Sequence, residues 1–195
     1  MIDDPSGGWE AIANDFIAAR SDIGRNVVRH WAKTLPRGGE VVDIGCGAGV
    51  PVAATLAEEG FSIFGIDASP TLLAAFRHRF PDAPTACETA QASSFFNRTF
   101  DAAIAVGLIF LLPADGQRQL IERVGRALKP GGRFLFSAPR QAAEWIDLQT
   151  GRPSQSLGEA QYGQLLAAAG MRLVNSYLDE GENYYFEAES YVRPA

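Results

Sequence analysis

The chain has 195 residues, a formal net charge of -6 and 47% hydrophobic residues, which is the composition of an ordinary globular protein with room for one sizeable core. The acidic balance offers no electrostatic case for binding nucleic acid or an anionic membrane. Neither Cys46 nor Cys87 has a neighbouring cysteine at metal-ligand spacing, and the chain has 2 histidines, so we expect no metal site. Both cysteines stand in contexts that look buried, which fits a reducing compartment. With no signal-like or membrane-length apolar run, the sequence predicts a cytoplasmic protein.

The N-terminal part is predicted to be helical. Residues 1–8 are interpreted as a disordered lead-in, and apolar residues at helical spacing predict a first helix over 9–17. Ser21 is the expected N-cap of a second helix, with Ile23 facing inward, and the break at 36–39 ends it. We therefore expect one domain, 1–195, with an N-terminal helical cap (1–38) and a core (39–195).

The run from Val41 to Gly49 is the feature around which the rest of the chain is arranged. Its β-branched residues suit a buried parallel strand. The alternate glycines at 45, 47 and 49 allow the backbone to turn sharply and to approach a ligand closely. The sequence therefore predicts a nucleotide-like ligand above this turn, at the carboxyl end of the strand.

Strand-like and helical patterns alternate along the rest of the chain, which predicts a doubly wound α/β sheet. The last two strands flank a tight turn at 179–182 and are expected to form an antiparallel hairpin. The longest irregular stretch is 139–153, and a capping box is expected to start the helix after it at Ser156. Strands are predicted at 41–44, 61–66, 85–87, 101–106, 133–138, 172–178 and 183–192, and helices at 50–59, 70–79, 116–128 and 156–169.

Two features bear on which nucleotide binds. The third glycine comes one residue earlier than in the dinucleotide fingerprint G-x-G-x-x-G. Asp67 closes the next strand, where a carboxylate can accept hydrogen bonds from both ribose hydroxyls. These two features alone leave NAD and other adenosine cofactors open.

Four segments in order add a family resemblance: 41–49, 64–69, the Phe100-Asp101 pair and the Lys-Pro-Gly-Gly stretch in 128–133. Together they resemble the class I S-adenosylmethionine-dependent methyltransferases, over about residues 41–191. The resemblance implies a Rossmann-like, doubly wound and mostly parallel seven-stranded sheet with an antiparallel last strand and helices on both faces. It also implies S-adenosylmethionine as cofactor and methyl transfer as the reaction.

The resemblance further implies a set of cofactor-binding residues. Counting back from Asp101 gives Glu88 as the partner of the adenine amino group, with Glu where the family more often has Asp. The implied residues are Asp43, Gly45, Cys46, Gly47 and Gly49 for the methionine part, Asp67, Ala68 and Ser69 for the ribose, Glu88, Thr89 and Ala90 for the adenine, and Val106, Gly107 and Leu108 near the sulfonium. Arg20, at the end of the first helix, is a further candidate for the cofactor carboxylate or for an acidic substrate.

The acceptor is read from charge and from the loop after the fourth strand. That loop is the apolar 107–110 stretch and not the Asn/Asp-Pro-Pro-aromatic signature of nucleic-acid amino-methyltransferases. We expect a small-molecule acceptor, no nucleic acid or membrane partner, and a monomer or homodimer. No residue in the sequence identifies itself as a catalytic base. The acidic turn at 179–182 could supply a general base or could be a solvated hairpin turn. The alternatives are a non-catalytic S-adenosylmethionine-binding sensor or assembly module, and an NAD(P)-dependent oxidoreductase.

Overall fold

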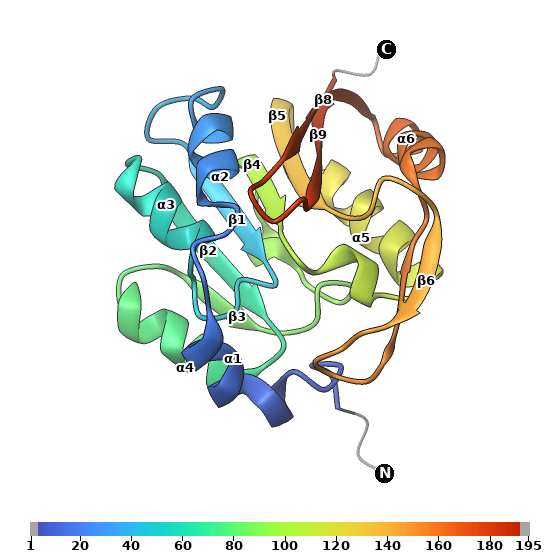
Figure 1. Cartoon of the computed structure of the whole chain (residues 1–195). Helices are drawn as coiled ribbons and strands as arrows, with labels where there is room; N and C mark the ends of the chain where they lie inside the picture. Colours follow the sequence, from blue (N-terminus) through green and yellow to red (C-terminus); the bar gives the residue numbers. More distant parts are fainter. Residues whose placement is uncertain (1–3, 192–195) are drawn as a thin grey trace.

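The structure, a computed structural model, describes residues 4–191. Residues 1–3 of the expected lead-in and Val192 of the last predicted strand lie outside the described residues. A 7-stranded sheet with the order β3-β2-β1-β4-β5-β9-β8 forms the centre of the molecule (Figure 1). Its strands are β1 (Glu40–Ile44), β2 (Ser62–Asp67), β3 (Thr85–Cys87), β4 (Phe100–Ala105), β5 (Leu128–Ser137), β8 (Met171–Leu178) and β9 (Tyr184–Ser190).

The sheet has the predicted topology. The pairs joining β3, β2, β1, β4 and β5 are all parallel, and β9 lies antiparallel between β5 and β8. The doubly wound sheet with an antiparallel last strand is therefore confirmed, as is the closing hairpin. Because β1 pairs with β2 on one side and with β4 on the other, the winding reverses beside β1. In open α/β sheets, ligands bind at this position.

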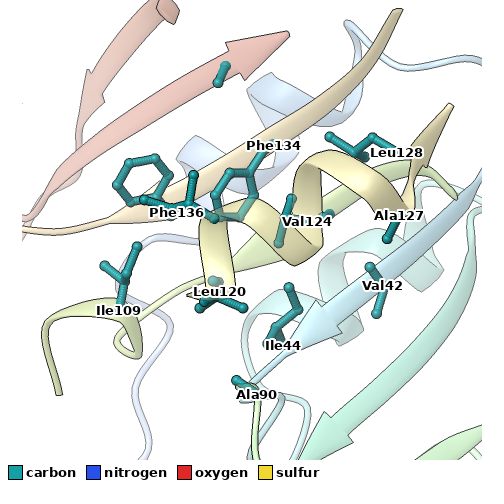
Figure 2. Close-up of a cluster of buried hydrophobic side chains, with 14 of the residues drawn as sticks. Val42, Ile44, Ala90, Ile109, Leu120, Val124, Ala127, Leu128, Phe134 and Phe136 are labelled. Carbon is teal, nitrogen blue, oxygen red and sulfur yellow. The ribbon is translucent and has the colours of Figure 1, made fainter. Parts of the chain in front are cut away.

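Helices cover both faces of the sheet (Figure 1). Helices α2 to α4 lie on one face and α5 and α6 on the other. Successive strand residues point to opposite faces of the sheet, so each strand contributes side chains to both cores. Val42 and Ile44 pack with the α5 side, as Figure 2 shows, whereas Val41 packs with the α2 side. The helices are α1 (Ala13–Ala19), α2 (Arg25–Ala32), α3 (Val52–Glu58), α4 (Pro70–Arg79), α5 (Ala114–Ala127) and α6 (Glu159–Ala168), with single 3₁₀ turns η1 (Glu10–Ile12), η2 (Phe95–Asn97) and η3 (Ile109–Leu111).

The N-terminal segment is more ordered than predicted. The Asp4 carboxylate accepts hydrogen bonds from the backbone and hydroxyl of Ser6 and from the Gly8 backbone N–H, so residues 4–8 are not a disordered lead-in. The N-cap of α2 is Gly24 in a left-handed conformation, not Ser21, and Ile23 is 45% exposed instead of buried. Only glycine fits at position 24, since an added Cβ would lie 2.4 Å from the Tyr185 hydroxyl oxygen.

A second sheet is formed by the stretch predicted to be irregular, 139–153, together with the residues that follow it. Strands β6 (Ala143–Ile146) and β7 (Pro153–Ser156) form an antiparallel hairpin. The expected capping box at Ser156 is wrong, because the Ser156 hydroxyl donates to the Pro139 carbonyl and Gly158 is the N-cap of α6. Cys46 is buried, but Cys87 is exposed, which corrects the expectation that both cysteines have buried surroundings.

Two of the recognised segments meet at the amino ends of the strands. The Asp101 carboxylate accepts the Glu40 backbone N–H at 2.9 Å and the Lys129 ammonium at 3.0 Å. A Cβ at Gly132 would lie 2.9 Å from the Lys129 carbonyl oxygen and 3.1 Å from the Asp101 carbonyl oxygen, so the backbone requires glycine there. This part of the sequence pattern therefore stabilises the fold.

Within residues 4–191 no helix is long and apolar enough to cross a membrane.

Replacing Asp101 with alanine should therefore reduce stability and leave cofactor affinity unchanged. The substitution leaves the Glu40 backbone N–H without its acceptor and removes the nearer of the two carboxylates beside the Lys129 ammonium. We expect a loss of about 1–3 kcal/mol in the free energy of unfolding. Chemical denaturation and calorimetric titration with S-adenosylmethionine measure the two quantities. Asp115→Ala, at a carboxylate that is 84% exposed on α5, is the control. A large loss of affinity in Asp101→Ala contradicts the structural role.

Candidate active site

The glycine turn follows β1 at the carboxyl edge of the sheet. The backbone N–H groups of Gly45 and Cys46 donate to the Ile66 carbonyl at 2.8 and 3.0 Å, which ties the turn to β2. Gly49 has a φ of +80°, and a Cβ there would lie 2.5 Å from the Phe80 ring. The glycine is thus required both for the backbone conformation and for the close packing of α4 beneath the turn.

Asp67, the last residue of β2, fixes the turn from the other side. One carboxylate oxygen accepts the Gly47 backbone N–H and the other accepts the Ser69 backbone N–H, each at 2.8 Å. Burial raises the pKa of this carboxyl, and the two hydrogen bonds oppose that effect. Each oxygen keeps a second lone pair, so the carboxylate can still accept hydrogen bonds from a ligand.

Asp43 presents a buried carboxyl group to the same edge. It lies two residues after Val41 along β1 and therefore points to the same side of the sheet, the α2 side. The side chain is 2% exposed, and its Oδ2 has no hydrogen-bond partner. Burial and, to a smaller extent, the nearby Asp67 raise its pKa to about 8 against the opposing effect of Arg20. A buried carboxyl without a partner is costly, so this position calls for a cationic or hydrogen-bond-donating ligand.

Arg20 lies beside the turn although it is far from it in sequence. It caps the C-terminal end of α1, its Nε donates to the Val50 carbonyl at 2.6 Å, and its guanidinium lies 4.9 Å from the centre of the Phe16 ring. The residue as a whole is exposed, but desolvation of its guanidinium by the surrounding atoms lowers its pKa, and Asp43 opposes that effect. Because an arginine has five donors, its terminal nitrogens can bind an anionic group while Nε holds the turn.

The remaining predicted residues lie on the same edge, after β3 and β4. The Glu88 backbone N–H donates to the Asp67 carbonyl, and one Glu88 carboxylate oxygen accepts the Ser93 hydroxyl at 2.6 Å. Thr89 is half-buried and Ala90 is buried. After β4, the Gly107 backbone N–H donates to the Ser137 hydroxyl, and Leu108 packs against Gly45. Val106 is half-buried and follows the last residue of β4.

Ser69 and Ala68 differ in their availability. Ala68 is half-buried beside Asp67, whereas Ser69 is fully buried. The Ser69 hydroxyl accepts the Leu72 backbone N–H and donates to the Glu10 carboxylate. The hydroxyl is thus used by the protein itself. Glu10 was not among the predicted residues, and no local pattern marks it, since its partners are 59 to 61 positions away.

Two segments approach one another over this edge. The loop between β6 and β7 reaches the N-terminal segment (Figure 1): Arg152 lies 3.9 Å from Asp4, and Thr150 lies against Gly8. A hollow of about 400 Å³ lies between them, lined by Gln149 of the hairpin and by residues of the helical segment. The latter are Ile12, Asp15, Phe16, Ala19, Arg20 and Ser21.

The β6–β7 hairpin is attached to the core by a buried polar network. The fully buried Gln117 of α5 donates to the carbonyls of Leu112 and Gln155, both at 2.9 Å, and accepts the Tyr162 hydroxyl at 2.8 Å. The Trp145 ring of β6 contacts Phe110 with 5.5 Å between centroids. These contacts hold an aromatic pair beside the carboxyl end of β4.

The candidate bases are occupied or distant. The buried Asp179 carboxylate accepts hydrogen bonds from Gly181, Asn183 and the Tyr185 hydroxyl, so this residue organises the hairpin turn. His30 and His78 are both exposed on helices away from the edge, on α2 and α4. Over residues 4–191, no group of His, Cys, Asp and Glu is arranged to hold a metal ion.

Comparison with known proteins agrees with this geometry. The family described as "Methyltransferase domain" matches residues 41–132. An uncharacterized methyltransferase of Synechocystis sp. is 30% identical over 154 residues, covering 74% of this chain and 72% of that protein. The structure of the CcbJ methyltransferase from Streptomyces caelestis aligns with a TM-score of 0.76 at 16% identity, over 97% of this chain and 100% of that one.

A second solved structure carries ligands. The 1,6-didemethyltoxoflavin-N1-methyltransferase of Burkholderia thailandensis, with bound 1,6-didemethyltoxoflavin and S-adenosylhomocysteine, aligns with a TM-score of 0.70 at 20% identity, over 98% of this chain and 92% of that one. The sheet, the glycine turn and these matches define a class I S-adenosylmethionine-dependent methyltransferase. The chain belongs to this family and uses S-adenosylmethionine as its cofactor, and the oxidoreductase alternative is thereby excluded.

The buried Asp43 should make the stability of the ligand-free protein depend on pH. Its pKa is about 8 in the folded protein and about 3.9 in an unfolded chain. The folded state therefore holds a proton that the unfolded state releases, so the free energy of unfolding falls as the pH rises from about 4 to about 8. Asp43→Asn should remove this fall, gaining about 2 kcal/mol or more over the wild type between pH 5 and pH 8. Denaturation at several pH values tests this, and parallel curves for the two proteins contradict it.

The Asp67 carboxylate should contribute directly to cofactor affinity. Asp67→Ala removes both the charge and the acceptors that fix Gly47 and Ser69, and we expect S-adenosylmethionine to bind at least about tenfold more weakly. Asp67→Asn retains one acceptor oxygen and should show a smaller loss. Calorimetric titration measures both affinities, and Asp67→Ala with wild-type affinity contradicts the assignment.

Proposed function

We propose that this methyltransferase transfers a methyl group to a small-molecule acceptor. The observation that carries the proposal is the covered carboxyl edge, where residues 4–20 and the tip of the β6–β7 hairpin meet. The hollow between them, about 400 Å³, is of the size that takes one small ligand. A polymer would need an open groove across this edge.

Charge and loop composition support the same acceptor class. The net charge is -6, which disfavours a nucleic-acid substrate. The loop after β4 presents Leu108 and Phe110, and Phe110 contacts Trp145 of the hairpin. The Burkholderia structure was solved with a small acceptor, 1,6-didemethyltoxoflavin, and its fold is similar to that of this chain.

The residues at the edge fit S-adenosylmethionine, and we propose how they hold it. The unpartnered Asp43 oxygen suits the cofactor ammonium, and the terminal nitrogens of Arg20 suit its carboxylate. The free lone pairs of Asp67 suit the ribose hydroxyls, and the second Glu88 oxygen suits the adenine amino group. Gly45, Cys46, Gly47 and Gly49 would contact the methionine part, Ala68, Thr89 and Ala90 the nucleoside, and Val106, Gly107 and Leu108 the region near the sulfonium. The fully buried Ser69 would act through Asp67, to which it donates its backbone N–H.

In the proposed mechanism, the protein orients its ligands. The cofactor supplies an electrophilic methyl group. The turn and the carboxylates would fix one reactant, and the Phe110–Trp145 pair beside the carboxyl end of β4 would align the acceptor nucleophile with the methyl carbon. Orientation alone can supply several kcal/mol of rate acceleration. An acceptor that is a good nucleophile needs no further group from the chain.

A methyl-transfer screen tests the acceptor class. The protein is incubated with methyl-labelled S-adenosylmethionine and separately with metabolite fractions, nucleic acids and proteins. We expect label in a small molecule, and we expect Asp67→Ala to reduce its rate at subsaturating cofactor. Transfer only to nucleic acid or protein contradicts the proposal. Cofactor binding without transfer to any fraction would favour the alternative, a non-catalytic sensor or assembly module.

A further inference from the structure

Glu10 connects the N-terminal segment to the sheet edge by an unusual set of contacts. Its carboxylate accepts hydrogen bonds from the Thr71 backbone N–H at 3.1 Å, from the Thr71 hydroxyl at 2.6 Å and from the Ser69 hydroxyl. Ser69 is the N-cap of α4, and Thr71 lies in its first turn. Three donors from one helix end thus converge on a carboxylate from a distant part of the chain.

The chemistry of this contact favours an ionised Glu10. The first N–H groups of a helix have no partners inside the helix and carry partial positive charge. The hydrogen bond from Ser69 lowers the pKa of Glu10 most, followed by those from Thr71. The carboxylate is therefore charged at neutral pH and complements the amino end of the ten-residue helix α4.

The same contact leads directly to the proposed ribose carboxylate. Ser69 donates its hydroxyl to Glu10 and its backbone N–H to Asp67. Asp67 in turn accepts the Gly47 backbone N–H. One hydrogen-bonded chain therefore runs from Glu10 through Ser69 and Asp67 to the glycine turn.

The segment from Glu10 to Arg20 contacts the turn at two more points. The Phe16 ring lies 3.5 Å from where a Cβ of Gly47 would be. Arg20 then donates to the Val50 carbonyl just after the turn. Between these ends the chain crosses the turn that, under the function proposed above, holds the cofactor. Glu10 is anchored on the α4 side and Arg20 on the α3 side.

We propose that Glu10 is a positioning residue: it holds residues 10–20 across the cofactor turn and thereby slows the departure of S-adenosylmethionine and S-adenosylhomocysteine. The contact replaces solvent at the turn with Phe16 and Arg20, so a bound cofactor leaves only when the segment lifts. The identity of the methyl acceptor does not enter this inference.

Amide hydrogen exchange of the ligand-free protein tests the contact itself. In Glu10→Ala we expect the amides of residues 10–20 to exchange about tenfold faster than in the wild type. Glu10→Gln keeps an acceptor oxygen for the hydroxyls but loses the charge, and should lie between the two. Asn14→Ala, at an exposed position of α1, and Glu122→Gln, at an exposed position of α5, are matched controls and should exchange like the wild type.

Stopped-flow dissociation of S-adenosylhomocysteine tests the consequence. The dissociation rate should rise by about tenfold in Glu10→Ala and by less in Glu10→Gln, and thermal unfolding confirms that each variant is folded. The proposal is overturned if Glu10→Ala and Glu10→Gln both show the exchange and dissociation rates of the wild type. It is also overturned if dissociation is faster but the amides of residues 10–20 do not exchange faster. A failure to find a small acceptor refutes the proposed function and leaves these two measurements unaffected.

Discussion

The site depends on one buried carboxyl group at the end of β1. Strand β1 is covered on both faces, so its alternating side chains go into one core or the other. Asp43 occupies a position that packing alone would give to an apolar residue, and its Oδ2 has no hydrogen-bond partner. Asp67 lies close enough to raise its pKa further, and Arg20 only partly offsets this. This buried carboxyl therefore destabilises the ligand-free fold. A ligand that brings a positive charge to it would remove that cost.

The carboxyl and amino edges of the sheet divide the recognised sequence pattern into two physical roles. At the carboxyl edge, Asp67 accepts a hydrogen bond from the glycine turn, and the neighbouring Asp43 keeps an oxygen without a partner. At the amino edge, Asp101 and Lys129 pair with each other and fix the start of β1. The resemblance rests on both sets together, whereas the structure separates them: only the first lies at the edge where we propose that the cofactor binds.

Much of the fold and most of the candidate site could be predicted because the signals are local. A β-branched run stopped by glycines, and a carboxylate at the next strand end, each identify a strand end without reference to the rest of the chain. Glu10 and Gln117 could not be predicted, because their partners come from other elements and depend on the tertiary arrangement. The β6–β7 hairpin was missed for the same reason. Its sequence lacks the strong alternation of an independent strand, and tertiary contacts with Gln117 and Tyr162 hold it in place. Ser21 is not the cap of α2, because the close packing of Tyr185 places a glycine, Gly24, at that position. Ser156 is not the cap of α6, because its hydroxyl donates a tertiary hydrogen bond to the Pro139 carbonyl.

Proton release on cofactor binding tests most directly whether Asp43 meets the cofactor ammonium. At about pH 6.5, Asp43 with its pKa of about 8 and an α-amino group with a pKa of about 7.7–8.0 both carry their protons before binding. Ionisation of Asp43 against the ammonium then releases a proton to the buffer. Calorimetric titration with S-adenosylmethionine, repeated in buffers of different ionisation enthalpy, counts that proton. We expect close to one proton released by the wild type and none by Asp43→Asn, and tight binding by the wild type without proton release would contradict the assignment.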